Sequence, residues 1–215
     1  MAVTIEETAE RHTFVGWAKD DPAGTEFAEV RRTGEGLSAS GVALGTDPEP
    51  YRLDYRLVTD ADLATTELSL TVTGSGWSRT LELRRSASAG WQLTTAAEGE
   101  CAFPPPGGDA EAIAEAVDPD VEVSPLFNTL PLLRHRLVDD GASVDLVMAW
   151  VSLPDLQVRP SRQRYTVMGA APEGQVVQFD GLDDGFTAEI VFDDDGLVLD
   201  YAGIARRILT NADRR

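Results

Sequence analysis

Hydrophobic and polar residues alternate with a period of two along much of the chain. In the clearest segment, Leu68, Leu70 and Val72 are separated by single polar residues, and segment 77–84 repeats the pattern. A β-strand points successive side chains to opposite faces of its sheet, so this alternation predicts strands with one buried and one solvated face. Such patterns predict strands at 26–32, 37–44, 51–59, 66–72, 77–84, 91–96, 132–138, 143–153, 156–168, 176–180, 186–192 and 197–201.

The turns between these segments favour antiparallel pairing of neighbouring strands. Asp-Asp-Gly occurs three times, at 139–141, 183–185 and 194–196. Asp-Gly accepts the positive φ angles of tight hairpin turns, and each copy lies beside predicted strands. The acidic run Asp193–Asp195 lacks the ligand spacing and the final glutamate of an EF-hand, so we do not predict that it binds a metal ion.

Helix-compatible segments are few and short. They predict one helix over 109–117, capped by its first aspartate, and a second over 203–211. The prolines and glycines of 104–108 mark a loop, so we predict a loop or helix insertion at 103–117 rather than a domain boundary. We therefore predict a single, mainly β domain over residues 1–215, built as a strongly curved antiparallel sheet or splayed barrel of about 12–15 strands with one or two short helices.

The composition narrows the choice of partners. The 215 residues carry a net charge of −19, with 37 acidic side chains against 18 basic ones. Nucleic-acid binding requires clustered cations, and an anionic membrane surface would repel the chain, so neither is an expected partner. No apolar stretch approaches the ~18 residues of a membrane span, and we expect no stable membrane insertion.

The single cysteine and the first residues indicate the compartment. Cys101 has no second cysteine with which to form an internal disulfide. The N-terminal segment lacks the basic and apolar regions of a secretory signal. Both features favour a reducing, cytoplasmic location. The sequence leaves the oligomeric state open.

The chain lacks the familiar catalytic motifs. Its two histidines, His12 and His135, belong to no Cys/His cluster with zinc-ligand spacing. Gly74–Gly76 contains a serine but does not complete the Gly-x-Ser-x-Gly turn of a nucleophile, and it is better explained as a hairpin turn. Cys101 has no histidine near it in the sequence. We predict no catalytic residue, no metal site and no cofactor.

The segment 118–136 differs from the alternating pattern around it. Pro125 and Pro131 bracket Phe127-Asn128-Thr129 and hold their neighbours extended. One interpretation is an ordered crossover between the two halves of the chain. The other is a rigid loop that presents Asn128 and Arg134 at the mouth of a pocket.

Ser124–Arg134 resembles the signature of the putative glycolipid-binding family of bacterial proteins. The segment reads Ser-Pro-Leu-Phe-Asn-Thr-Leu-Pro-Leu-Leu-Arg and is preceded by an acidic lead-in at Asp118 and Asp120. The similarity extends over most of the chain, with further matching blocks at 51–56, 90–91, 151–156, 163–166 and 192–201.

The resemblance implies a fold and a function. The family is similar in shape to bacterial lipoprotein carriers, in which a strongly curved antiparallel sheet encloses an apolar cavity. The implied function is non-enzymatic binding of a lipid-like or glycolipid-like ligand in the concave interior. The residues expected to contact a sugar or phosphate headgroup, or to line the cavity, are Asn128, Arg134, Gln163, Tyr165, Trp77, Trp91 and Trp150.

Two other functions remain open. An enzyme on a barrel-like scaffold would place a titratable group with a perturbed pKa inside a pocket. A structural or interaction module would have a filled core and a large exposed apolar patch. The aromatic residues can equally be core, and Arg134 can equally form an ion pair with a carboxylate on a neighbouring strand. A continuous apolar cavity would favour binding.

Overall fold

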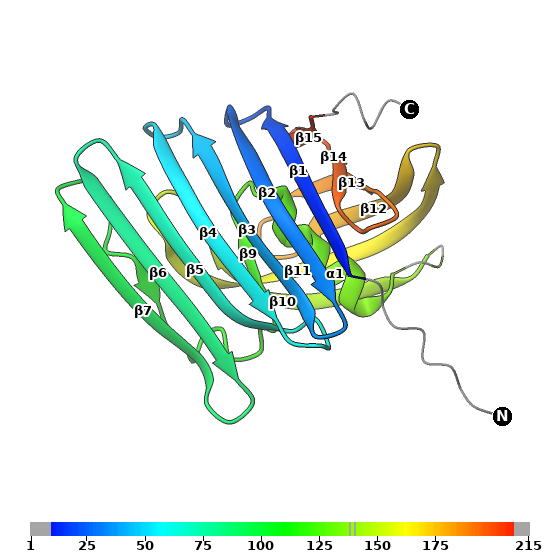
Figure 1. Cartoon of the computed structure of the whole chain (residues 1–215), viewed down its shortest axis with the longest axis horizontal. Helices are drawn as coiled ribbons and strands as arrows, with labels where there is room; N and C mark the ends of the chain where they lie inside the picture. The colour runs from blue at the N-terminus through cyan, green and yellow to red at the C-terminus, as the bar shows by residue number, and fades with distance from the viewer. Residues whose placement is uncertain (1–9, 138, 140, 209–215) are drawn as a thin grey trace.

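A single 15-stranded sheet contains every strand of the residues that the structure describes. The computed structural model describes residues 10–137, 139 and 141–208 (Figure 1). The first seven strands are β1 (Arg11–Lys19), β2 (Gly24–Thr33), β3 (Gly36–Gly45), β4 (Tyr51–Thr59), β5 (Thr65–Gly74), β6 (Trp77–Ser86) and β7 (Gly90–Gly99). After them come β8 (Gly107–Gly108), β9 (Pro119–Val121), the 3-10 helix η1 (Pro125–Asn128), α1 (Thr129–His135), β10 (Ser143–Val151), β11 (Gln157–Ala171), β12 (Gly174–Gly181), β13 (Thr187–Phe192), β14 (Val198–Tyr201) and β15 (Ala205–Arg207).

The alternating segments form strands with one buried and one solvated face, as predicted. In β5, Leu68, Leu70 and Val72 are buried while the residues between them are half-buried. In β6, Leu81 and Leu83 are buried in the same way. The inward side chains form one core that continues across the sheet.

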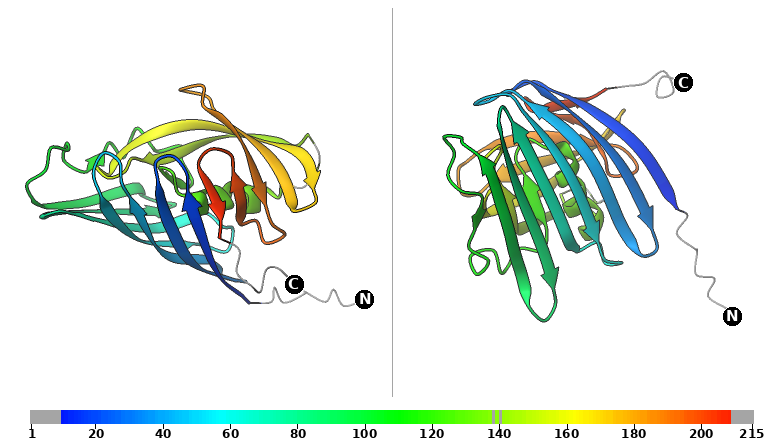
Figure 2. Two further views of the ribbon diagram at one scale, coloured as in Figure 1. Left: turned by 90° about the horizontal axis from the view of Figure 1, so that it is seen from above. Right: turned by 60° about the vertical axis from the view of Figure 1, so that its left-hand side comes forward.

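The strands follow one another in two antiparallel meanders. The chain runs outward from β1 to β7 and then crosses to the opposite edge, where β9 pairs in parallel with β10; the second meander returns from β10 to β15. β15 pairs with β1 in the middle of the sheet, with Trp17 opposite Arg207. The sheet bends so strongly that its two halves face each other (Figure 2). Within the described residues, the edge strands β7 and β9 do not pair with each other. The sheet is therefore curved but not closed into a barrel.

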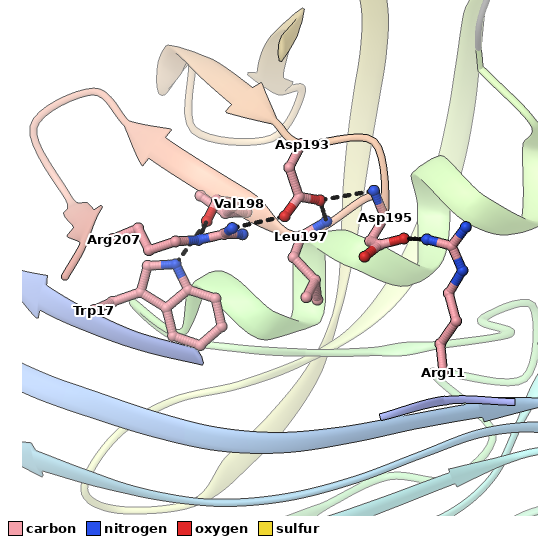
Figure 3. A network of polar contacts seen from close by, with 7 residues as sticks. All are labelled: Arg11, Trp17, Asp193, Asp195, Leu197, Val198 and Arg207. Carbon is pink, nitrogen blue, oxygen red and sulfur yellow. Dashed lines mark hydrogen bonds and ion pairs between the residues drawn. The ribbon is translucent and has the colours of Figure 1, made fainter. Parts of the chain in front are cut away.

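Polar contacts hold the seam between the two meanders (Figure 3). The Trp17 indole N–H donates to the carbonyl of Val198 at 2.8 Å, and Arg207 Nε donates to the same oxygen at 3.0 Å. Arg207 also forms a 2.6 Å ion pair with Asp193, whose other oxygen accepts from the backbone N–H of Asp195 at 2.9 Å. These contacts support the three-residue β1–β15 pairing, which is much shorter than the neighbouring β1–β2 pairing.

The segment 118–137 lies between the two layers of the sheet, where it fills part of the concave interior (Figure 2). Phe127 is fully buried, and its ring meets Tyr55 of β4 edge-on with centroids 5.6 Å apart. Pro125 begins η1, and Pro131 lies in the first turn of α1, where a helix does not need its N–H. The crossover interpretation of this segment is therefore correct for most of its length.

Three predicted elements are wrong. Residues 132–135, predicted as strand, belong to α1; Val138 lies outside the described residues. The predicted helix 109–117 is a series of turns, in which the Trp91 indole N–H donates to the carbonyl of Ala116 at 2.8 Å. The predicted helix 203–211 contains a turn and β15; residues 209–211 lie outside the described residues.

The Asp-Gly turns have the predicted backbone but differ in what they connect. Gly141, Gly185 and Gly196 all have φ between +75° and +79°. The turns at Gly185 and Gly196 join β12 to β13 and β13 to β14, whereas the turn at Gly141 connects α1 to β10 and makes no hairpin. Within the described part of the chain, no helix has the length and apolar character needed to cross a bilayer.

Candidate functional site

A pocket of about 230 Å³ lies on the concave side of the second meander, between the β9–η1 segment and strands β10 to β14. It is smaller than the ~300–1,000 Å³ of sites that enclose a drug-sized ligand, so it suits a compact group. The side chains and backbone that line it belong to Asp120, Val121, Glu122, Val123, Ser124, Asn128, Trp150, Ser161, Gln163, Phe179, Gly181, Asp184, Phe186, Tyr201 and Ile204.

One hydrogen-bonded chain runs along the wall of the pocket. The Gln163 side-chain amide donates to Asp120 at 2.7 Å, and its oxygen lies 3.2 Å from the Tyr165 hydroxyl. The same hydroxyl lies 3.0 Å from the Asn128 side-chain oxygen. Gln163, Tyr165 and Asn128 are all buried, and the Asp120 contact fixes the orientation of the Gln163 amide. The pocket is thus lined by planar polar groups held in defined positions.

Three carboxylates give the pocket a negative character. Burial raises the pKa of Asp120 to about 6, against the opposing effect of the Gln163 amide. Burial also raises the pKa of Glu122, which accepts from the backbone N–H of Leu153 at 2.7 Å. Asp184 accepts from the backbone N–H of Phe186 at 3.0 Å. None of the ion pairs among the described residues involves these three carboxylates.

Aromatic rings lie beside this polar row on the neighbouring strands, where Phe179 of β12 pairs with Tyr165 of β11 and their ring centroids are 5.3 Å apart. The ring centroid of Phe179 is 5.9 Å from that of Phe186 and 6.2 Å from that of Tyr201. Trp150 reaches the pocket from β10, and the guanidinium of Arg159 stacks 4.3 Å from its ring. Aromatic faces beside planar hydrogen-bonding groups provide both apolar contact and directed polar contact for one ligand.

A buried polar cluster anchors the pocket at its base. Ser124 lines the pocket and donates to Glu26 at 2.7 Å, and the Tyr55 hydroxyl donates to the same oxygen at 2.9 Å. Lys19, the only lysine of the chain, lies 3.1 Å from the other oxygen of Glu26. Burial and the Glu26 charge raise the pKa of Tyr55 well above its ordinary value. These contacts join the segment after β9 to strands β1, β2 and β4.

A family model described as "Putative glycolipid-binding" matches residues 14–207. The chain belongs to this family. The crystal structure of a DUF1089 family protein from Pseudomonas aeruginosa is similar, with a TM-score of 0.66 and 28% sequence identity over 85% of this chain and 92% of the other. No curated protein matches the sequence.

The glycolipid-binding family motif contributes both to the pocket and to the core. Its Asn128 lines the pocket together with Gln163 and Trp150, and Tyr165 lies directly behind them. Arg134, at the other end of the motif, forms a 2.6 Å ion pair with the fully buried Asp118. Four of the expected ligand-binding residues are therefore brought together, while Arg134 lies elsewhere.

The Asp118–Arg134 pair ties the motif to the first meander. The second oxygen of Asp118 accepts from both the backbone N–H and the hydroxyl of Thr65, at 3.2 and 2.9 Å. Burial raises the pKa of Asp118, while Arg134 and Thr65 oppose that shift. The acidic lead-in and the arginine of the family motif are thus partners of each other in this chain.

The other two expected aromatic residues also lie outside the pocket. Trp91 is a buried residue of β7, and its indole N–H donates to the Ala116 carbonyl. Trp77 donates to Glu49 at 2.6 Å and packs edge-on against Phe103. Both act as core residues in the first meander.

Several pocket residues were not singled out from the sequence. Asp120 could have been found from its place in the acidic lead-in of the motif. Phe179 and Tyr201 carry no such signal, because an inward aromatic residue of a strand has the same pattern in a filled core as in a pocket. Their contribution depends on how β11, β12, β13 and β14 pair side by side.

Proposed function

We propose that the protein binds a glycolipid through its sugar headgroup in the pocket beside Asp120, Gln163 and Asn128. The observation that carries this proposal is the hydrogen-bonded row of amide and carboxylate groups beside a cluster of aromatic rings in one pocket. Sugar hydroxyls both donate and accept hydrogen bonds, so they match carboxylate and amide partners. The apolar faces of a sugar ring match the aromatic side chains.

The filled interior limits where the lipid tail can lie. Phe127 and Leu126 are buried between the sheet layers, in the space that a carrier-like fold would leave to an acyl chain. The proposal therefore places the headgroup in the pocket and the tail at its rim, where Phe186 is 41% exposed. This differs from an acyl chain enclosed in an apolar cavity.

Titration with octyl glycosides of glucose, galactose and mannose tests the proposal. We expect at least one glycoside to bind by calorimetry, and an octyl ether of pentaethylene glycol, with the same tail and no sugar, not to bind. Gln163→Leu should weaken glycoside binding by about tenfold or more, because it removes the amide that Asp120 orients. Gln92→Leu is the matched control, since Gln92 is exposed on β7.

Two results would contradict the proposal. If the ether binds as tightly as the glycosides, the protein recognises the octyl chain and not the sugar. If no glycoside binds, or if Gln163→Leu and Gln92→Leu have equal effects, the pocket is not a sugar site. Native mass spectrometry of protein from its own host then shows whether a glycolipid is retained.

Glycoside hydrolysis is a second candidate function, favoured by one observation. Asp120 is a pocket carboxyl whose pKa is raised to about 6, which is what a general acid near neutral pH requires. Release of nitrophenol from p-nitrophenyl glycosides tests this function. Turnover by the wild type that Asp120→Asn abolishes would support it, and binding of octyl glycosides without turnover would exclude it for those sugars.

A further inference from the structure

Three arginines converge on a second depression, at the C-terminal end of α1. This depression has a volume of about 260 Å³ and includes Arg32 from the end of β2 and Arg134 and Arg136 from α1 and its cap. Figure 1 shows the end of α1 beside the start of β1 and the end of β2. The chain as a whole carries a net charge of −19, so a basic cluster contrasts with the rest of the molecule.

The arginines are only partly neutralised by the protein. Arg134 pairs with Asp118 through one terminal nitrogen, and its buried Nε has no hydrogen-bond partner among the described residues. Arg32 and Arg136 take part in none of the side-chain hydrogen bonds or ion pairs found in the described ranges 10–137, 139 and 141–208. Among the described residues, Asp62 is the one acidic residue that lines the depression.

The position at a helix end explains only part of this arrangement. Basic side chains stabilise the C-terminus of a helix, which accounts for Arg134 in the last turn. Two of the last carbonyls of α1 are already occupied, because Leu132 accepts from Leu137 N–H and Leu133 accepts from Arg136 N–H, both at 3.3 Å. Arg32 comes from a different element and has no such role. The helix end alone therefore does not account for three guanidinium groups in one place.

We propose that this depression binds a phosphate group. A guanidinium group presents several N–H donors in a fixed plane, and arginine clusters recognise phosphate oxygens through charge-assisted hydrogen bonds. Leu63 and Leu133 also line the depression and offer apolar contact to whatever carries the phosphate. The site is separate from the sugar pocket, since it shares none of that pocket's residues.

Calorimetric titration at low ionic strength with three probes tests the proposal. The probes are inorganic phosphate, glycerol 3-phosphate and dihexanoyl phosphatidic acid, with zwitterionic dihexanoyl phosphatidylcholine as the comparison. We expect these three probes to bind and the phosphatidylcholine to bind at least about tenfold more weakly. Tighter binding of the phosphatidic acid would identify a phospholipid as the source of the group, and equal affinity for all three probes would identify phosphate alone.

A pair of double variants separates the site from the overall charge. Arg32→Gln with Arg136→Gln should weaken binding about tenfold or more, and Arg134 is kept because it neutralises Asp118. Arg31→Gln with Arg52→Gln removes the same charge from exposed positions that already pair with Glu29 and Asp54. Equal losses in the two variants, or no binding of any phosphate probe, would overturn the proposal. Neither result depends on whether the sugar pocket binds a glycoside.

Discussion

The ion pair of Asp118 and Arg134 shows how a recognisable motif residue can act away from the pocket. Asp118 is fully buried, and its side chain receives Arg134 on one oxygen and Thr65 on the other. From the sequence, an arginine beside a polar loop supports both a headgroup contact and an ion pair. Only the fold brings Asp118 near enough to decide the partner.

Arg134→Met should lower the free energy of unfolding by about 3–5 kcal/mol, because it leaves the Asp118 carboxylate buried without its cation. Chemical denaturation measures the change. Arg84→Met is the control: its ion pairs are exposed, so the cost should be below about 1 kcal/mol. The double variant with Asp118→Asn should recover part of the loss. Equal costs for Arg134→Met and Arg84→Met would show that the buried pair does not act as described.

Asp120 should make the stability of the protein depend on pH. Its pKa is about 6 in the folded chain against an ordinary value of 3.8. Between these values the folded chain holds a proton that the unfolded chain has released, so the free energy of unfolding falls as pH rises from about 4 to 6. Asp120→Asn has no carboxyl proton to lose. Over that range its free energy of unfolding should therefore rise by about 2 kcal/mol relative to that of the wild type.

Thermal unfolding of Asp120→Asn and wild type at pH 4.5 and 7.5 (about 3 pH units apart) measures this gain. The titratable groups that face Asp120 are Glu122 on its own segment, Asp184 in the β12–β13 turn, and the neutral hydroxyls of Tyr165 and Tyr201. Asp145→Asn should show no gain, because Arg164 lowers the pKa of Asp145. A stability difference between Asp120→Asn and wild type that does not vary with pH would contradict the assignment.

At the scale of elements, alternation identified most strands of the sheet. It succeeded in β4, β5 and β6 because their outward residues are polar. It missed β1, whose outward face carries Phe14, Gly16 and Ala18, so the two faces do not differ in polarity. It misassigned α1 because the proline suggested an extended chain, although a proline is tolerated in a first turn.

The candidate site was predictable only where a motif marked it. Asn128 and Gln163 lie in blocks that resemble the family, and both reach the pocket. The pocket also needs Phe179 and Tyr201, which β12 and β14 bring to it through strand pairing. Sequence patterns report local periodicity, whereas this wall depends on pairing between elements.

The turn between β13 and β14 allows the packing of α1 to be tested. Gly185 and Gly196 have nearly the same backbone angle, with φ of +75° and +76°. A Cβ atom at Gly196 would lie 2.6 Å from the Leu133 side chain of α1, whereas one at Gly185 would meet nothing within 4 Å.

Gly185→Ala should therefore cost about 1–2 kcal/mol for the positive φ alone. Gly196→Ala should cost about 1 kcal/mol more, because Leu133 must shift to make room. Denaturant unfolding of both variants measures the difference. If the two costs are equal, α1 does not pack tightly against this turn.

At the scale of the whole molecule, the two meanders form one sheet and share one core. We expect the protein to unfold in one cooperative transition, because the β1–β15 pairing and the Asp118–Thr65 contacts join the halves. Scanning calorimetry checks this expectation by comparing the calorimetric and van't Hoff enthalpies. Two resolved transitions would indicate that the halves fold as separate domains.

The β1–β15 seam also has a consequence for how the chain folds. Trp17 and Arg207 are about 190 residues apart, so their pairing closes a very long loop at an entropic cost. Around the sheet, however, the order from β10 to β15 and then from β1 to β7 is a single antiparallel meander, and only β8 and β9 pair in parallel, with β11 and β10. The break in chain order between β15 and β1 therefore lies in the middle of the sheet, and not at one of its edges. A circularly permuted chain, with β15 joined to β1 and new ends between β7 and β8, would keep the same strand pairs. The β1–β15 pair would then join strands adjacent in the sequence, so the permuted chain should fold faster.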